Sequence, residues 1–157
     1  MAKKKKKKVV PMPTRMKRAA KAAHKALSLY VRTVFIAEYN GKCPLCGVNP
    51  IQALFHILRS KTVKILRYDI RNVIASCHKC NWIEYRNPDP SRAWYIRKYG
   101  VEQYLQLVDE GANKLDFTLE DYEKIAKNFT NLLAAWKSIQ EAPEPVRPAL
   151  PPDVPRL

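Results

Sequence analysis

An α+β fold is predicted for this chain of 157 residues, with helices on both sides of a small core held together by cysteines. Three observations predict it. Apolar residues recur at helical spacing before and after the middle of the chain. The middle carries two Cys-x-x-Cys pairs around short β-branched runs, and the two ends are Lys-rich and Pro-rich. We therefore expect one domain of ordinary size between two tails.

The N-terminal part divides into an arm and a helix. Residues 1–14 are predicted to form a disordered basic arm, because six consecutive lysines repel one another and Pro11 and Pro13 lack backbone N–H groups. A helix is predicted over residues 15–40, where the Asn40-Gly41 pair supplies a stop signal. Its apolar side chains are Leu27, Tyr30, Val34 and Phe35.

The middle of the chain, residues 41–112, is predicted to be a compact core with the helices that follow it. Short strands are expected where β-branched residues cluster, at Val63–Leu66 and Val73–Ala75. Two short helices should follow, one from Ser91 as N-cap to Tyr99 and one from Val101 to Glu110.

The C-terminal part is predicted to be a long helix over residues 113–140 and a Pro-rich tail over 141–157. Thr118 precedes Glu120 and Asp121, an arrangement typical of a helix start. The apolar stripe of this helix fits either an intramolecular core or a dimer face, so a homodimer is one expectation: Tyr122, Ile125, Ala126, Phe129, Leu132, Leu133 and Trp136. Six of the twelve prolines lie after residue 142, which excludes further helix there.

The net charge of +15 requires an anionic partner or a reason to tolerate self-repulsion. Eleven cations and no acid lie within residues 1–27, and eleven cations face three acids between Lys42 and Lys98. No apolar run has the ~20 residues of a bilayer span, and the lysine run is not followed by the apolar stretch of a signal peptide. A cytoplasmic protein without a membrane partner is expected.

The four cysteines form two knuckles that predict a structural zinc site: Cys43, Cys46, Cys77 and Cys80. Four thiolates close a tetrahedral site and leave no position for water. Redox or disulfide use of these cysteines is the alternative, and His78 could replace one ligand. Because 30 residues separate the knuckles, the zinc would hold the base of an inserted segment.

The inserted segment is rich in cations around one histidine, His56. Asp69 is its only acid between Arg59 and Arg71. We expect the cations of this segment to contact phosphates, although a solvated strand face is the usual fate of such residues: Arg59, Lys61, Lys64, Arg67 and Arg71. No base-reading signature is present, which favours recognition of backbone and shape.

The order His56, Asn72, Asn81 resembles the HNH, or ββα-metal, nuclease motif. The chain from Cys43 to about Trp136 resembles the phage NinG/Rap recombination proteins, a family of HNH-type, structure-specific DNA endonucleases. The matching pieces are Cys-Pro-Leu-Cys-Gly, Phe-His56-Ile-Leu-Arg59, Leu-Arg-Tyr-Asp-Ile-Arg-Asn72-Val, Cys-His-Lys-Cys-Asn81, Asn87 and Tyr95-Ile-Arg-Lys-Tyr-Gly100. About 94 of the 157 residues are covered, without the tails.

The resemblance implies a zinc-stapled ββα-metal core that hydrolyses branched recombination intermediates of the Holliday-junction or D-loop type. It gives His56 the role of general base and places a catalytic Mg²⁺ or Mn²⁺ at His56 and Asn81. Asn72 would brace the hairpin that aims His56. Further DNA contacts are expected from Asn87 and from the arm lysines Lys3, Lys4, Lys5, Lys6, Lys7 and Lys8.

Three departures from the family pattern favour other readings. Ala53 stands where the family usually has an Asp, Phe55 where it has a small Gly, and Tyr85-Arg86-Asn87 where it has Ser-Gly-Asn. The missing Asp at position 53 favours the alternative function, a non-catalytic zinc-containing DNA- or RNA-binding protein. His56 could also be an ordinary core histidine, and the asparagines could be caps or turn residues.

Overall fold

The computed structural model describes residues 11–59, 62–113 and 115–141. Its elements confirm the α+β class, with five helices, two short 3₁₀ helices and a two-stranded antiparallel sheet in these residues. The six arm lysines, Lys61 and the Pro-rich tail lie outside the described residues. None of the described helices is long and apolar enough to cross a membrane.

Helix α1 (Met12–Glu38) begins three residues before the predicted start. Pro11 is its N-cap and Pro13 lies in the first turn, where the missing N–H groups have no intrahelical partner to lose. Residues 12–14 therefore belong to the helix and not to the arm. Asn40 and Gly41, both with positive φ, end the helix as predicted, and the Gly41 N–H donates to the Ile36 carbonyl.

The sheet consists of β1 (Ala53–His56) and β2 (Val73–Ser76), with Ala53 opposite Ser76 and His56 opposite Val73. The prediction of β2 is confirmed, whereas the predicted strand at Val63–Leu66 is wrong. That segment contains a 3₁₀ helix, Lys64–Tyr68, and a second one follows at Ile70–Asn72. Leu66 and Tyr68 are buried in these turns, which connect the strands.

Three helices follow the sheet: α2 (His78–Arg86), α3 (Asp89–Tyr99) and α4 (Val101–Gly111). The predicted N-cap at Ser91 is wrong, because α3 begins at Asp89 after Pro88. The Ser91 hydroxyl donates to the Pro88 carbonyl within the first turn. Gly100, with φ of 93°, separates α3 from α4.

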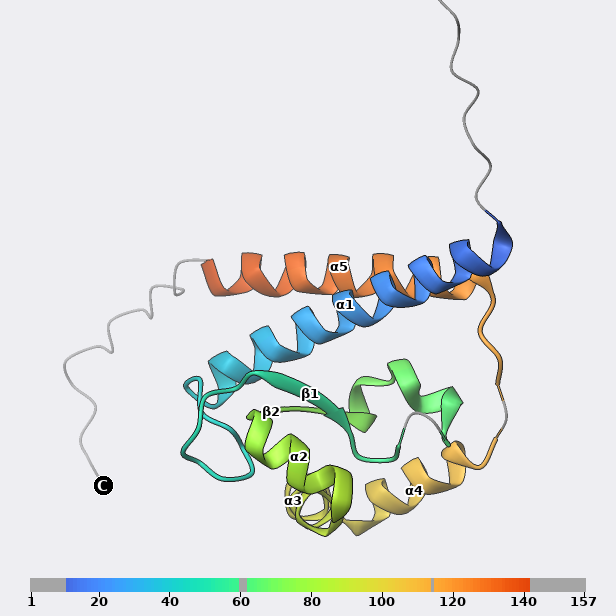
Figure 1. The fold of residues 1–157 in the computed structure, drawn as a ribbon. Coiled ribbons are helices and arrows are strands. Elements are labelled where there is room, and N and C mark those ends of the chain that lie inside the picture. The colour runs from blue at the N-terminus through green and yellow to red at the C-terminus, as the bar shows by residue number, and fades with distance from the viewer. Residues whose placement is uncertain (1–10, 60–61, 114, 142–157) are drawn as a thin grey trace, which may run out of the picture.

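Helix α5 (Leu119–Glu141) lies beside α1 and runs in the same direction (Figure 1). Thr118 and Asp121 bond reciprocally at its start, as the predicted cap requires. Tyr30 of α1 packs against Phe129 of α5, with ring centroids 5.8 Å apart. The other face of α1 covers the sheet, and α2 contacts β1 (Figure 1). The α5 stripe thus contributes to an intramolecular core.

Candidate functional site

The four cysteines come together at the open end of the hairpin. Their Sγ atoms all lie within 4.8 Å of one another, and the Cys46 and Cys77 sulfurs are 3.9 Å apart. Around a tetrahedral zinc with Zn–S distances near 2.3 Å, sulfurs are separated by about 3.8 Å. The cluster therefore confirms the predicted grouping of the cysteines and has the size to hold a zinc ion.

The surroundings of the cysteines shift the pKa of three of the four thiols. Burial raises the pKa of the Cys43 and Cys80 thiols, so both resist ionisation without a positive charge between them. Burial also opposes ionisation of Cys46, but the backbone N–H groups of Asn49 and Val48 lower its pKa to about 6. Cys77 caps α2 by accepting from the Cys80 N–H at 3.4 Å, so the cluster fixes the start of this helix.

His56 ends β1, and its ring orientation is set by one hydrogen bond. Its Nε2 lies 2.8 Å from the backbone oxygen of Arg67. Because a carbonyl only accepts, Nε2 carries the hydrogen, and the neutral ring has its lone pair on Nδ1. Among the described residues, none forms a hydrogen bond with Nδ1. This nitrogen is therefore able to accept a proton.

Burial lowers the pKa of His56 below its usual value of 6.5. The bond to the Arg67 carbonyl opposes this shift, and the nearby charges of His24 and Arg67 add to it. His56 is therefore neutral at pH 7, as a base must be.

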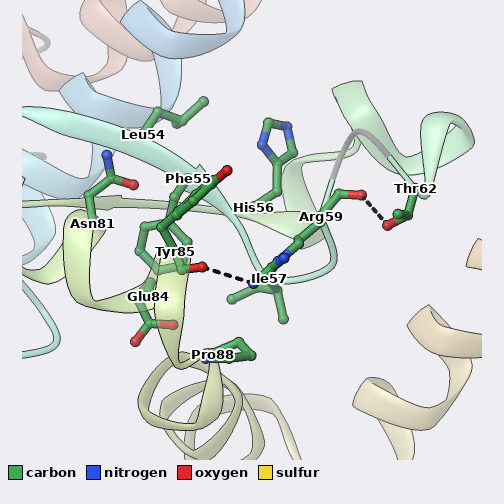
Figure 2. A pocket seen from close by; sticks show the side chains of 10 residues that line it. All are labelled: Leu54, Phe55, His56, Ile57, Arg59, Thr62, Asn81, Glu84, Tyr85 and Pro88. Carbon is green, nitrogen blue, oxygen red and sulfur yellow. Dashed lines mark hydrogen bonds between the residues drawn. The ribbon is translucent and has the colours of Figure 1, made fainter.

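An open cleft of about 350 Å³ lies beside His56 (Figure 2). Asn81 lines it from α2, and Arg59 lines it from the segment after β1. The Arg59 guanidinium donates to the Tyr85 carbonyl at 2.9 Å and lies 5.6 Å from the centre of the Tyr85 ring. The structure thus brings together three of the predicted site residues, His56, Asn81 and Arg59, at one opening.

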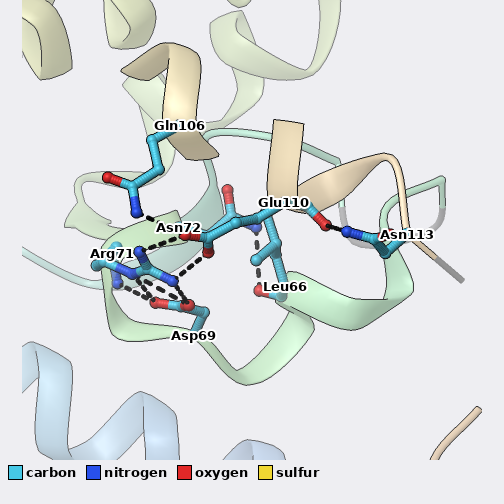
Figure 3. A network of polar contacts seen from close by, with 7 residues as sticks. All are labelled: Leu66, Asp69, Arg71, Asn72, Gln106, Glu110 and Asn113. Atoms are coloured by element: carbon cyan, nitrogen blue, oxygen red, sulfur yellow. Dashed lines mark hydrogen bonds and ion pairs between the residues drawn. The ribbon is translucent and has the colours of Figure 1, made fainter. Parts of the chain in front are cut away.

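Asn72 is fully buried, with 0% of its surface exposed. Its Oδ1 accepts from the Leu58 N–H at 2.7 Å, and its Nδ2 donates to the carbonyls of Leu58 and Leu66 at 3.0 and 3.1 Å. These bonds tie the chain after His56 to the first 3₁₀ helix. Figure 3 shows the bond between Asn72 and Leu66. Asn72 consequently acts on the shape of the loop and does not line the cleft.

Replacing Asn72 with alanine is expected to lower the free energy of unfolding by about 3 kcal/mol, because three hydrogen bonds vanish and buried backbone groups lose their partner. Urea unfolding followed by circular dichroism measures this. Asn128→Ala, at an exposed position of α5, is the matched control and should change stability by less than about 0.5 kcal/mol. Equal stability of the two variants would contradict the bracing role.

The Arg71 guanidinium forms ion pairs with two carboxylates (Figure 3). Its guanidinium lies 2.6 Å from Asp69 and 2.5 Å from Glu110, which joins the segment before β2 to the end of α4. The same pairing lowers the pKa of Glu110. Arg71 therefore connects two elements of the fold. Because two carboxylates already neutralise its positive charge, it is less suited to bind a phosphate than the sequence suggests.

The other residues predicted to contact DNA differ in the contacts that they already make within the protein. Lys64 forms an exposed ion pair with Asp116, at 3.0 Å. Arg67 is exposed, lies over the ring of Tyr68 and bonds His56 through its carbonyl. Asn87 accepts from the Asp89 N–H at 3.1 Å in the turn between α2 and α3, which is a local structural role.

Sequence reasoning missed Glu84, which also lines the cleft. Only 6% of its surface is exposed, its Oε2 has no hydrogen-bond partner among the described residues, and burial raises its pKa. Figure 2 places its carboxylate beside Pro88, away from the His56 ring. Its spacing of three residues from Asn81 on one helix was a signal that could have found it.

Ala53 leaves the cleft without the carboxylate expected three residues before the histidine. It pairs with Ser76 at the start of β1. Among the described lining residues, Glu84 is the one carboxylate. Asn81 adds an amide oxygen, which is also a suitable ligand for a hard cation.

Comparison with known proteins places the chain in a family. No curated protein and no solved structure matches it. The sequence model of the bacteriophage lambda NinG protein matches residues 1–139, which include the cysteine cluster, the hairpin, α2 and most of α5. The protein therefore belongs to the bacteriophage lambda NinG family.

Proposed function

We propose that this protein is a metal-dependent DNA endonuclease of the HNH type that acts on branched recombination intermediates. The observation that carries the proposal is the state of His56, a residue that lines the cleft: its neutral ring is bonded through Nε2, and no described residue forms a hydrogen bond with its Nδ1. The chain order β1, β2, α2 supports it, because this hairpin and helix place His56 and Asn81 on one opening.

The chemistry assigned to His56 is proton removal. Nδ1 accepts a proton from a water molecule, the water oxygen attacks phosphorus, and the bond from phosphorus to the 3′ oxygen breaks. A Mg²⁺ or Mn²⁺ ion, when bound, supplies positive charge to the scissile phosphate and to the leaving oxygen. Asn81 would hold the ion through its amide oxygen, with phosphate oxygens and water as further ligands. Zinc at the four cysteines would keep α2 in place.

The first test is a cleavage assay of the purified full chain with four-way junctions, forks, D-loops and linear duplex. Mg²⁺, Mn²⁺ and metal-free buffer are compared. Cleavage of the branched substrates that requires added metal is expected. Binding of these DNAs without a nick in either metal would instead support the alternative, a non-catalytic zinc-containing nucleic-acid-binding protein, which the missing carboxylate at Ala53 favours.

The Arg59 guanidinium is expected to contact a DNA phosphate, whereas the Arg71 guanidinium is not. Arg59→Gln is expected to reduce the slope of log K against log salt for duplex DNA by about 0.9, the value of one phosphate contact. Arg71→Gln is the matched control and should leave the slope unchanged, because Asp69 and Glu110 already neutralise that guanidinium. Fluorescence anisotropy over a salt series measures both. Equal slopes for the two variants would contradict this division of roles.

A further inference from the structure

Helix α2 exposes two large aromatic side chains on the surface next to the cleft. Trp82 is 59% exposed and Tyr85 is 71% exposed. They are three residues apart and therefore lie on the same side of the helix. Large aromatic residues normally bury most of their surface, so two adjacent exposed ones indicate a binding surface.

The aromatic rings are interleaved with cations. The Arg86 guanidinium lies over the Trp82 ring, 4.2 Å from its centre, and Arg59 lies over Tyr85. Lys79 lines a surface hollow together with Trp82 and Tyr85. Glu84, the one acid in α2, is buried. We call the five residues the α2 platform: Arg59, Lys79, Trp82, Tyr85 and Arg86.

The platform is continuous with the catalytic cleft. Asn81 and Tyr85 line both the cleft beside His56 and the hollow beside Trp82. Figure 2 shows Tyr85 standing between Asn81 and Arg59. A strand whose phosphate lies at His56 can therefore reach the aromatic rings.

We propose that the α2 platform binds unpaired nucleobases of the DNA, which stack on Trp82 and Tyr85 while the cations contact the flanking phosphates. Every base offers a π-face to an aromatic ring, and guanidinium groups stack on such rings as well. In a paired duplex the base faces are already stacked on each other. At a branch point or a single-stranded arm they are free. The inference rests on the proposed function and supplies a physical basis for preferring branched DNA.

Charge argues against a second copy of this chain as the occupant. In a two-fold contact the same patch meets itself, which would bring Arg86, Lys79 and Arg59 against their own symmetry mates. Like charges opposed in this way repel one another. An anionic partner with flat apolar faces fits both the cations and the exposed aromatic rings of the platform.

The test measures binding in the His56→Ala background with Ca²⁺, so that cleavage does not interfere. A forked DNA carries 2-aminopurine at its first unpaired position, and a linear duplex of equal length serves as the comparison. Trp82→Ala and Tyr85→Ala are each expected to weaken binding of the fork about tenfold and to abolish the 2-aminopurine response. Duplex affinity should change less than about twofold, because its bases are already stacked.

Two further variants control the experiment. Trp82→Phe keeps a flat ring and should restore most of the fork affinity. Ile139→Ala removes a side chain of similar exposure from α5 and should bind both DNAs as the parent does. Equal losses on fork and duplex, or unchanged binding of the fork, would overturn the platform. If light scattering shows that the parent protein is a dimer and the Trp82→Ala variant a monomer, a second copy of this chain occupies the surface and the platform proposal is overturned.

Failure of the platform and failure of the nuclease proposal are distinguishable. If platform variants bind the fork normally while the wild-type chain cleaves it, the stacking surface is wrong and the endonuclease stands. If the wild-type chain never cleaves while platform variants lose fork binding, the stacking surface stands and the endonuclease is wrong.

Discussion

Replacing His56 with alanine is expected to reduce cleavage of branched DNA by about 10²–10⁴-fold, the usual contribution of a general base. The proposed role of this side chain as proton acceptor rests on its lowered pKa and on an Nδ1 that no described residue bonds. The rate is measured as kcat/KM on a junction with Mg²⁺. DNA affinity and zinc content are measured on the same sample and should not change.

The pH dependence gives an independent check on the same residue. Because the pKa of His56 lies below 6.5, the neutral base persists as the pH falls through 6.5. The acidic limb of kcat/KM should therefore lie below pH 6.5, and His56→Ala should lose this limb.

Two variants separate catalysis from folding. His56→Gln offers an amide donor in place of the Nε2–H donor toward the Arg67 carbonyl but has no basic nitrogen, so it should fold and remain inactive. His24→Gln changes a histidine of α1 that does not line the cleft and should retain cleavage. Cleavage by His56→Ala at the wild-type rate would show that another group removes the proton.

Replacing Cys43 or Cys77 with serine is expected to release zinc and unfold the segment that carries the cleft. Zinc binding in small structural modules supplies about 10–16 kcal/mol, as much as the whole stability of a typical domain. Cys77 also caps α2, so the helix that carries Asn81 would lose its start. Elemental analysis should find one zinc per wild-type chain and none in the variants. Thermal unfolding should shift to lower temperature or lose cooperativity.

Val48→Ala is the matched control for the cysteine variants, since Val48 lies in the same knuckle with an exposed side chain. It should keep the zinc and the unfolding temperature. A wild-type protein that is purified without metal and melts unchanged after chelation would contradict a structural zinc and would favour free thiols.

Several helix ends were predictable because their signals are local. Thr118 and Asp121 cap α5, Asn40 and Gly41 end α1, and Gly100 separates α3 from α4. Each signal acts within a few residues of the chain, so the printed sequence contains it.

The strand prediction at Val63–Leu66 failed because a strand needs a neighbouring strand to pair its backbone groups. Val63 and Ile65 are β-branched and favour strands, but no described strand lies beside them to pair with. Instead, the Leu66 carbonyl accepts from the buried amide of Asn72, six residues later. Leu66 and Tyr68 are the buried residues of the 3₁₀ helix that forms there.

The sequence alone determined the ingredients of the site: the cysteine quartet by its spacing and His56 by its cationic surroundings. Only the tertiary structure decided which cations are free, since Arg71 is neutralised by Glu110 from a distant helix while Arg59 stands at the cleft. It also exposed Trp82 and Tyr85 and buried Glu84. Spacing along the chain fixes which residues can meet, but burial and charge pairing depend on packing between elements far apart in sequence.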